Sequence, residues 1–245
     1  HPTVAVITNA QRAHLAGMGS LEAIAREKGS IFTGLDEQGV AVINADDPWA
    51  GLWRAQSRGL EVMTFGCEHP ADVTGKVHLH GLESRLAIRA PGGQFDVVLA
   101  LPGQHNARNA LAAAAACLAA GVPIAAVQAG LSRFRGLKGR LQQRAALHGA
   151  VLLDDTYNAN PDSVRAGIDV LAATIGKKLM VLGDMGEIGD MTAQFHDEIG
   201  GYAKSQGIDR LFALGEASAL AARNFGAGGA HYVAIERLID ALCAE

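Results

Sequence analysis

The chain has 245 residues, of which 49% are apolar and 19% charged, a composition typical of a globular protein large enough for two domains. A formal net charge of −4, with no long run of one sign, argues against a nucleic-acid-binding or anionic-membrane surface. No apolar segment is long enough to span a bilayer, and three scattered cysteines without a C-x-x-C pair indicate reduced thiols in the cytosol.

The first half of the chain predicts alternating strands and helices, followed by antiparallel hairpins. Strands are expected at 3–8, 39–44 and 61–66, and helices at 20–33, 49–57, 106–120 and 123–134. Residues 71–100 alternate loosely between apolar and polar side chains around a Pro-Gly-Gly turn, which is typical of hairpins. Because proteins rarely start on a bare interior strand, we expect that residues preceding His1 have been removed.

A basic, Gly-rich segment at 134–140 predicts a domain boundary, which we place after Arg140. Beyond it, strands are expected at 150–154, 178–183, 210–215 and near 231–233. Helices are expected at 161–174, 192–206, 216–224 and 234–244. This alternation predicts a parallel sheet with right-handed crossovers.

The segment from Asp154 to Ser163, Asp-Asp-Thr-Tyr-Asn-Ala-Asn-Pro-Asp-Ser, is the most informative part of the chain. Its two carboxylates follow an apolar run that predicts a buried strand, and ligands of open α/β sheets bind at the carboxyl ends of strands. Adjacent acids are costly to bury without a metal, a ribose hydroxyl or a cation as partner. Asn160 and Pro161 predict a helix cap, which leaves Asp155 and Asn158 as candidates for binding.

Two basic side chains follow the first strand, and each allows two interpretations. His14 lies where an imidazole could bind a metal, or it is an ordinary loop histidine. Lys28 lies on the apolar face of the first long helix, either as a desolvated, reactive amine or with its ammonium extended to water.

Three further polar residues are candidates for binding an anion. Asn106 and Asn109 share one face at a helix N-terminus, which favours anions, although Asn106 could simply cap the helix. Arg140 could bind a phosphate between the domains or be a solvated linker charge. The 245 residues contain no G-x-x-x-x-G-K-[ST] phosphate loop.

These segments together resemble the Mur ligase family of bacterial peptidoglycan synthesis. The similar stretches run in family order over essentially the whole chain: 14–32, 42–46, 101–110, 139–141, 154–163 and 181–185. The pairing of Asp-Asp-Thr-Tyr-Asn-Ala-Asn-Pro with Gly-Asp-Met resembles the branch that adds D-alanyl-D-alanine, and differs from folylpolyglutamate synthase.

The resemblance implies an α/β fold in two parts. Residues 1–140 are expected to form a truncated central ATPase domain, with a parallel sheet plus antiparallel hairpins. Residues 141–245 are expected to form a Rossmann-like C-terminal domain that lacks its last strand.

The resemblance also implies a role for each candidate, with ATP and Mg²⁺ as cofactors. His14 and Lys28, the latter as a carbamate, would hold magnesium and serve catalysis. Asn106, Asn109 and Asn158 would lie near the adenine. Arg140 would contact the nucleotide phosphates, and Asp155 would bind the ribose.

The implied activity is ATP-dependent ligation of D-alanyl-D-alanine to UDP-N-acetylmuramoyl tripeptide through an acyl phosphate, by a cytoplasmic monomer without membrane insertion or nucleic-acid binding. Without a phosphate loop, the 245 residues alone are expected to be inactive. The alternatives are a folylpolyglutamate synthase-like ligase and a non-catalytic ligand-binding module.

Overall fold

The computed structural model describes residues 2–12 and 15–245, and the chain divides into two compact units. The first unit comprises His1–Gln11 and Met18–Gly136, and the second comprises Arg12–Gly17 and Leu137–Glu245. The division lies between Gly136 and Leu137, whereas the sequence predicted it after Arg140. No helix in the described part of the chain is long and apolar enough to cross a membrane.

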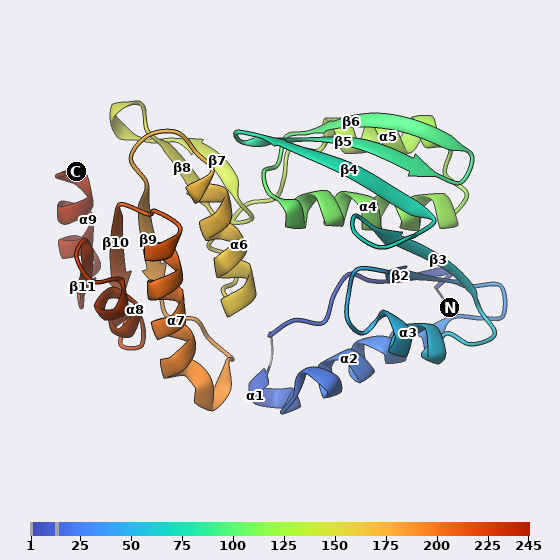
Figure 1. Ribbon diagram of the computed structural model, residues 1–245, viewed down its shortest axis with the longest axis horizontal. Helices are drawn as coiled ribbons and strands as arrows, with labels where there is room; N and C mark the ends of the chain where they lie inside the picture. The colour runs from blue at the N-terminus through green and yellow to red at the C-terminus, as the bar shows by residue number, and fades with distance from the viewer. Residues whose placement is uncertain (1, 13–14) are drawn as a thin grey trace. The chain divides into compact units, whose positions relative to one another are not determined.

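The first unit is built on a six-stranded mixed sheet (Figure 1). In spatial order its strands are β1 (Val4–Ile7), β2 (Val40–Asn44), β3 (Glu61–Gly66), β4 (Val73–His80), β5 (Glu83–Ala90) and β6 (Gly93–Leu99). Strands β1 to β4 pair in parallel, and β4 to β6 pair antiparallel. The predicted parallel sheet plus antiparallel hairpins is therefore confirmed.

Helices cover both faces of this sheet (Figure 1). They are α2 (Leu21–Gly29) with the 3₁₀ turn η1 (Ser30–Gly34), α3 (Ala50–Gln56), α4 (Gln104–Ala119) and α5 (Ile124–Arg133), while the short α1 spans Leu15–Met18. Figure 1 shows α4 on one side of the parallel strands and α2 and α3 on the other. The small alanines of α4 let its backbone approach the sheet, and Ala107, Ala114 and Ala115 are fully buried.

Two predicted helix limits of the first unit were wrong. The helix expected at 20–33 ends at Gly29 and continues only as the 3₁₀ turn, although Ser20 caps it as predicted. The helix expected to start at Asn106 starts at Gln104, because Gly103 adopts a φ of +92° and takes the N-cap position. Glycine adopts this conformation without the steric cost that other residues meet.

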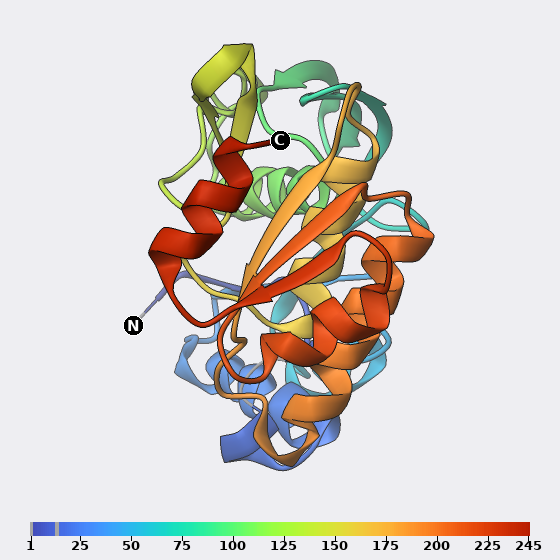
Figure 2. The ribbon, with the colours of Figure 1, turned by 90° about the vertical axis from the view of Figure 1, so that its left-hand side faces the viewer.

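The second unit contains a three-stranded parallel sheet in the order β11 (Gly229–Tyr232), β10 (Arg210–Leu214), β9 (Leu179–Gly183). Its helices are α6 (Pro161–Ala172), α7 (Thr192–Ser205), α8 (Ser218–Phe225) and α9 (Ile235–Cys243), with 3₁₀ turns η2 (Leu147–Gly149) and η3 (Gly189–Met191). Figures 1 and 2 show α9 on the opposite side of the strands from α7. Phe195 and Ile199 of α7 pack in one core with Leu182 and Leu211 of the sheet. The predicted Rossmann-like second domain is confirmed in its parallel core.

The strand before the Asp-Asp pair differs from the prediction. β8 (Val151–Asp154) is not a buried member of the parallel sheet but pairs antiparallel with β7 (Gln142–Ala145) in a separate two-stranded sheet. Val151 and Leu152 are 58% and 50% exposed. The prediction was wrong because a short apolar run does not reveal its pairing partner, and the polar sequence of β7 gives no strand pattern.

The start of α6 allows a test of the predicted cap. Asn160 accepts hydrogen bonds from the backbone of Asp162 and Ser163 at 3.1 and 3.0 Å, and Ser163 Oγ accepts from Asn160 N at 3.0 Å. We expect Asn160→Ala to lower the free energy of unfolding in urea by about 1 kcal/mol. Asn160→Asp should stay close to the parent, and an equal loss in both variants would contradict a capping role.

Candidate functional site

Lys28 lies near the end of α2 and is half-buried in the first unit. Its Nζ donates a hydrogen bond to the carbonyl oxygen of Asn9, just past β1, at 2.8 Å. Burial lowers the pKa of Lys28, and the nearby carboxylate of Asp47 opposes this shift. The ammonium is therefore hydrogen-bonded to the backbone just past the end of β1.

An open pocket of about 470 Å³ lies beside this amine, within the first unit. It is lined by the end of β1 and by the junction of α2 with η1: Val6, Ile7, Thr8, Asn9, Glu27, Lys28, Ser30 and Ile31. A ligand in this pocket could reach the Lys28 amine, the type of group that becomes reactive when it is desolvated.

The described residues by themselves do not fit a magnesium site. Among them, no group of three or more His, Cys, Asp or Glu side chains could hold a metal ion. Magnesium prefers oxygen ligands, and the Lys28 ammonium only donates hydrogen bonds. The predicted metal ligand His14 lies outside the described residues.

Asp46, two residues past β2, anchors the loop that follows β3. Its carboxylate accepts hydrogen bonds from the backbone N–H groups of Cys67, Glu68 and His69 at 2.6, 3.0 and 2.8 Å, and its side chain is only 4% exposed. Burial alone would raise the pKa of Asp46, but these hydrogen bonds outweigh it and the pKa is lowered. Sequence analysis gave Asp46 no role of its own, although an acid two residues after a buried strand is a usable signal.

We expect Asp46→Ala to lower the free energy of unfolding by about 2–3 kcal/mol near neutral pH, because three backbone donors lose a charged acceptor. Since folding lowers the pKa of Asp46, its contribution is present above the unfolded-state pKa of about 4 and is lost as the pH falls through the folded-state value. Urea titrations of both proteins should therefore converge in acid. A difference that stays constant down to pH 3 would contradict this account.

Asn106 and Asn109 lie in the first turns of α4, and the structure corrects one interpretation of Asn106. The residue is not the N-cap, since it lies inside the helix and its Nδ2 donates to Pro102 O at 2.8 Å. Asn109 is exposed. Positions three apart share a helix face, so the two amides remain candidates for hydrogen bonds to a heterocyclic base.

In the second unit, Asp155 is bonded to the segment that contains Arg140. Its Oδ1 accepts from the backbone N–H of Leu141 at 3.1 Å. Burial raises the pKa of Asp155, while the Leu141 hydrogen bond and the Arg140 charge oppose this shift. Leu141 is buried at a φ of +50°, a conformation that is uncommon for a residue with a Cβ and indicates a constrained site.

A second contact holds the same two segments together. The guanidinium of Arg140 lies 4.1 Å from the centre of the Tyr157 ring, and Tyr157 N donates to Gly139 O at 3.1 Å. Arg140, Tyr157 and Asn158 are all exposed. An exposed cation, an aromatic ring and a half-buried carboxylate therefore lie on adjoining segments of one unit.

Asp154, the other acid of the pair, has a structural role. Its Oδ1 accepts from the Thr156 hydroxyl at 2.7 Å, and its Oδ2 lies 3.6 Å from the Arg144 guanidinium. Asp154 therefore has partners within its own hairpin and turn.

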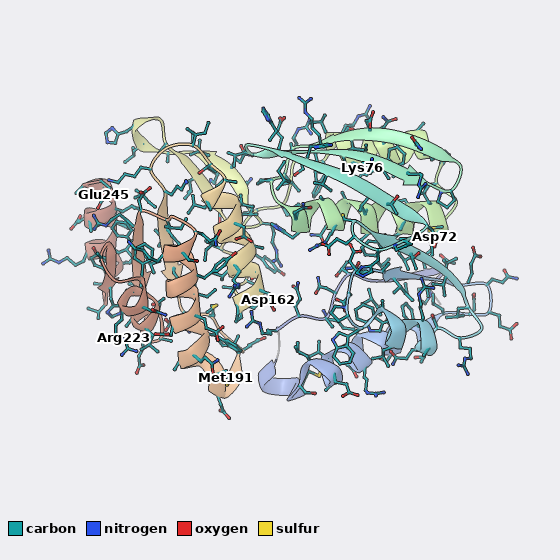
Figure 3. All side chains as sticks on the ribbon, in the orientation of Figure 1. Asp72, Lys76, Asp162, Met191, Arg223 and Glu245 are labelled. Carbon is teal, nitrogen blue, oxygen red and sulfur yellow. The ribbon has the colours of Figure 1, made fainter. Side chains whose placement is uncertain are left out.

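Asp162 has a partner that the sequence did not reveal. It is labelled in Figure 3, in the first turn of α6. Its Oδ2 accepts from Arg12 N at 2.9 Å, and its Oδ1 accepts from Arg12 Nε at 3.0 Å and Nη2 at 2.5 Å. Both residues belong to the second unit. From the sequence, Asp162 was expected only to interact favourably with the dipole of its helix. The contact with Arg12 was not predicted, because the two residues lie 150 positions apart and no local motif connects them.

The Gly-Asp-Met segment follows β9 and is tied to the rest of the second unit at two points. Asp184 Oδ1 accepts from Ser218 N at 2.7 Å, and the Met185 N–H donates to Nε2 of His196 at 2.9 Å. Sequence analysis missed His196; the available signal was a histidine at helical spacing with the apolar residues Phe195 and Ile199 of α7.

Comparisons with known proteins cover both units. Residues 1–117 match the Mur ligase middle domain, and residues 139–244 match the Mur ligase glutamate ligase domain. The UDP-N-acetylmuramoyl-tripeptide–D-alanyl-D-alanine ligase of Escherichia coli K12 is 39% identical over 220 residues, covering 89% of this chain and 48% of the relative. The Haemophilus influenzae ligase of the same name is 34% identical, covering 98% and 52%. The chain spans about half the length of the curated relatives it matches.

A solved structure of MurF from Acinetobacter baumannii is 32% identical, with a TM-score of 0.93, covering 99% of this chain and 53% of that one. Both halves thus match domains of one family, in the same order and with the same fold. The chain belongs to the Mur ligase family of ATP-dependent amide ligases.

Proposed function

We propose that this chain provides the nucleotide-binding and acceptor-binding parts of a ligase that joins D-alanyl-D-alanine to UDP-N-acetylmuramoyl tripeptide, as the names of its relatives describe. The enzyme would act as a monomer in the cytoplasm, between a soluble nucleotide-linked peptide and a soluble dipeptide. The observation that carries the proposal is the pairing of segments 139–141 and 155–157, which brings Arg140 beside Asp155.

The proposed nucleotide contacts follow from the geometry of these side chains. Asp155 is half-buried beside Arg140, and its carboxylate can accept hydrogen bonds from the two ribose hydroxyls. The exposed Arg140 guanidinium suits phosphate oxygens, since its fixed fork of donors matches their spacing. Asn106, Asn109 and Asn158 would hydrogen bond near the adenine.

Lys28 and His14 are proposed as the magnesium-associated residues. The lowered pKa of Lys28 increases the fraction of neutral amine, the form that reacts with carbon dioxide to give a carbamate. That reaction replaces a cation by a carboxylate-like anion, which is a suitable magnesium ligand. Magnesium would supply charge neutralisation during phosphoryl transfer.

The proposed reaction has two steps. A carboxylate oxygen of the tripeptide attacks the γ-phosphorus of ATP, ADP leaves, and an acyl phosphate forms. The free amine of D-alanyl-D-alanine then attacks the acyl carbon, phosphate leaves with that carboxylate oxygen, and the amine proton passes to solvent. Arg140 neutralises charge on the nucleotide phosphates, and Asp155 holds the ribose, so the chain contributes by positioning and electrostatics.

The 245 residues contain no phosphate loop, so we propose that they are inactive alone. The test therefore uses the same sequence extended to the full length of the curated relatives, here called the extended ligase. Phosphate release is measured with ATP, UDP-N-acetylmuramoyl tripeptide and D-alanyl-D-alanine, in parallel with folate and L-glutamate. Release only with the peptide substrates supports the proposal. Release only with folate and glutamate favours the folylpolyglutamate synthase alternative, and no release with either pair favours a non-catalytic module.

A further inference from the structure

Residues 8–10, which follow β1, are held by two side chains from the end of β2 and the turn after it. Asn44 Nδ2 donates a hydrogen bond to Thr8 O at 2.7 Å, and Asp47 Oδ2 accepts one from Ala10 N at 3.0 Å. Asn44 is the last residue of β2 and is buried. Because β1 and β2 are adjacent parallel strands, these bonds fasten together their carboxyl ends, the edge at which α/β sheets bind ligands.

Asn9 lies between these two bonds and is the residue that contacts Lys28. Its carbonyl oxygen accepts from Lys28 Nζ at 2.8 Å. The amine of α2 therefore has a backbone acceptor whose position is set by a bond to the residue on either side. The open pocket of about 470 Å³ includes Thr8, Asn9 and Lys28 in its lining. The hydrogen bond thus lies in the wall of a space that a ligand can enter.

The turn that supplies these two side chains is itself fixed. Asn44 Oδ1 accepts from Asp46 N at 2.9 Å, and Asp47 Oδ1 accepts from Trp49 N at 2.9 Å. Asn44 and Asp47 each use one atom to hold their own turn and another to hold the segment after β1. Supporting contacts of this kind keep a functional group in one geometry. Sequence analysis noted residues 42–46 as similar to the family but gave Asn44 and Asp47 no role.

We propose that Asn44 and Asp47 are positioning residues for the Lys28 amine, an inference that rests on the proposed function. They hold the Asn9 carbonyl from both sides, and this carbonyl fixes the amine nitrogen at the pocket. The nitrogen keeps one N–H when it becomes a carbamate, so the carbonyl can accept from it in either form. Asn44 and Asp47 act through the backbone of residues 8–10 and do not touch a substrate.

Two substitutions each remove one bond to the segment after β1. Asp47→Ser keeps a hydroxyl that can accept the Trp49 N–H but is too short to reach Ala10, and Asn44→Ala removes the donor to Thr8. In the extended ligase we expect each variant to lower kcat for dipeptide-dependent phosphate release by about tenfold or more, because the amine is displaced. The KM for ATP should change by less than about twofold. A parent-like kcat in either variant, or a rise in the KM for ATP as large as the fall in kcat, overturns the inference.

Ser84→Ala is the matched control for loss of a buried hydrogen bond. Ser84 is fully buried in β5, and its Oγ donates to Leu101 O, before α4, at 2.8 Å. This variant loses a bond of the same kind in the same unit, so it should keep kcat within about twofold of the parent. A fall in kcat equal to that of Asp47→Ser means a general stabilising role and overturns positioning.

Acylation of the 245-residue chain with an amine-specific reagent gives a readout that is independent of activity. Mass spectrometry of the peptides should show that Lys28 reacts about tenfold faster in Asp47→Ser than in the parent, because the amine loses its fixed acceptor. The exposed Lys76 should keep its parent rate. Ser84→Ala should leave the rate of Lys28 unchanged, and equal acceleration in that control overturns the inference.

The labelling of Asn44→Ala separates positioning from charge. Burial lowers the pKa of Lys28 and the Asp47 carboxylate opposes this shift, so Asp47→Ser removes a charge as well as a bond. Asn44→Ala changes no charge, and it should also accelerate the acylation of Lys28. Acceleration in Asp47→Ser alone overturns positioning.

Failure of this inference differs from failure of the proposed function. If the extended parent ligase releases no phosphate, the proposed function fails and takes the catalytic purpose of Asn44 and Asp47 with it. If that parent is active but kcat does not respond to Asp47→Ser, only the present inference fails.

Discussion

Replacing Lys28 by alanine in the extended ligase is expected to lower kcat for dipeptide-dependent phosphate release by about 100- to 1,000-fold, the usual effect of removing one preorganised electrostatic group. The Lys28 amine lies at the end of β1, beside an open pocket and near Asp47. Because burial lowers its pKa, the ammonium is less favourable in the folded protein than in water, and alanine should leave the thermal midpoint nearly unchanged. Loss of activity would therefore report on chemistry and not on unfolding.

Two controls identify what Lys28 supplies. Lys28→Arg keeps a positive charge but does not form a stable carbamate, so we expect it to be as inactive as the alanine variant. Lys76→Ala removes an exposed lysine of β4, labelled in Figure 3, and should keep activity within about twofold. The parent should lose activity in carbonate-free buffer and regain it with bicarbonate. An active Lys28→Arg variant, or a parent that does not respond to bicarbonate, would contradict the carbamate.

Replacing Asp155 by alanine is expected to raise the KM for ATP by about 10- to 100-fold, because the ribose hydroxyls lose a charged acceptor. Since burial raises the pKa of Asp155, its carboxylate takes up a proton at a higher pH than an exposed aspartate does. The KM for ATP of the parent should therefore rise as the pH falls toward that raised value, and the alanine variant should lack this dependence. Steady-state kinetics at several pH values measure both effects.

The adjacent acid provides the matched control for Asp155. Asp154 belongs to the same hairpin and turn, but it is bonded to Thr156 and faces Arg144. Asp154→Asn should leave the KM for ATP within about twofold of the parent, while Asp155→Asn should raise it although an oxygen remains to accept the Leu141 N–H. Similar KM values for ATP in the two asparagine variants would contradict the proposed role of Asp155 in binding the nucleotide.

Sequence periodicity predicted most of the fold, because the elements of the two main sheets carry clear apolar patterns. Val40–Asn44 and Arg210–Leu214 were expected as strands and are strands. The predictions failed where the apolar pattern of a segment does not reveal which strand it pairs with. The apolar sequence of Val151–Asp154 predicted a core strand. Its pairing partner Gln142–Ala145 is polar, and the hairpin that the two strands form is largely exposed.

The candidate site shows the same limit. Asp155 and Arg140 were identified from the sequence, yet the hydrogen bond through Leu141 that holds their segments together depends on a left-handed backbone that no local motif specifies. The Arg12–Asp162 ion pair joins distant positions, and His196 pairs with a backbone N–H outside its own helix. Contacts of this kind arise from tertiary packing, which spacing along the chain does not encode.

Oxygen transfer tests the central claim, ligation through an acyl phosphate, most directly. The extended ligase is supplied with ATP, D-alanyl-D-alanine and UDP-N-acetylmuramoyl tripeptide labelled with ¹⁸O in the carboxylate that forms the amide. If that oxygen attacks the γ-phosphorus and later leaves with phosphate, each phosphate released carries one ¹⁸O atom, visible by mass spectrometry together with one ADP and one UDP-linked pentapeptide. Pentapeptide formed with unlabelled phosphate would contradict the account.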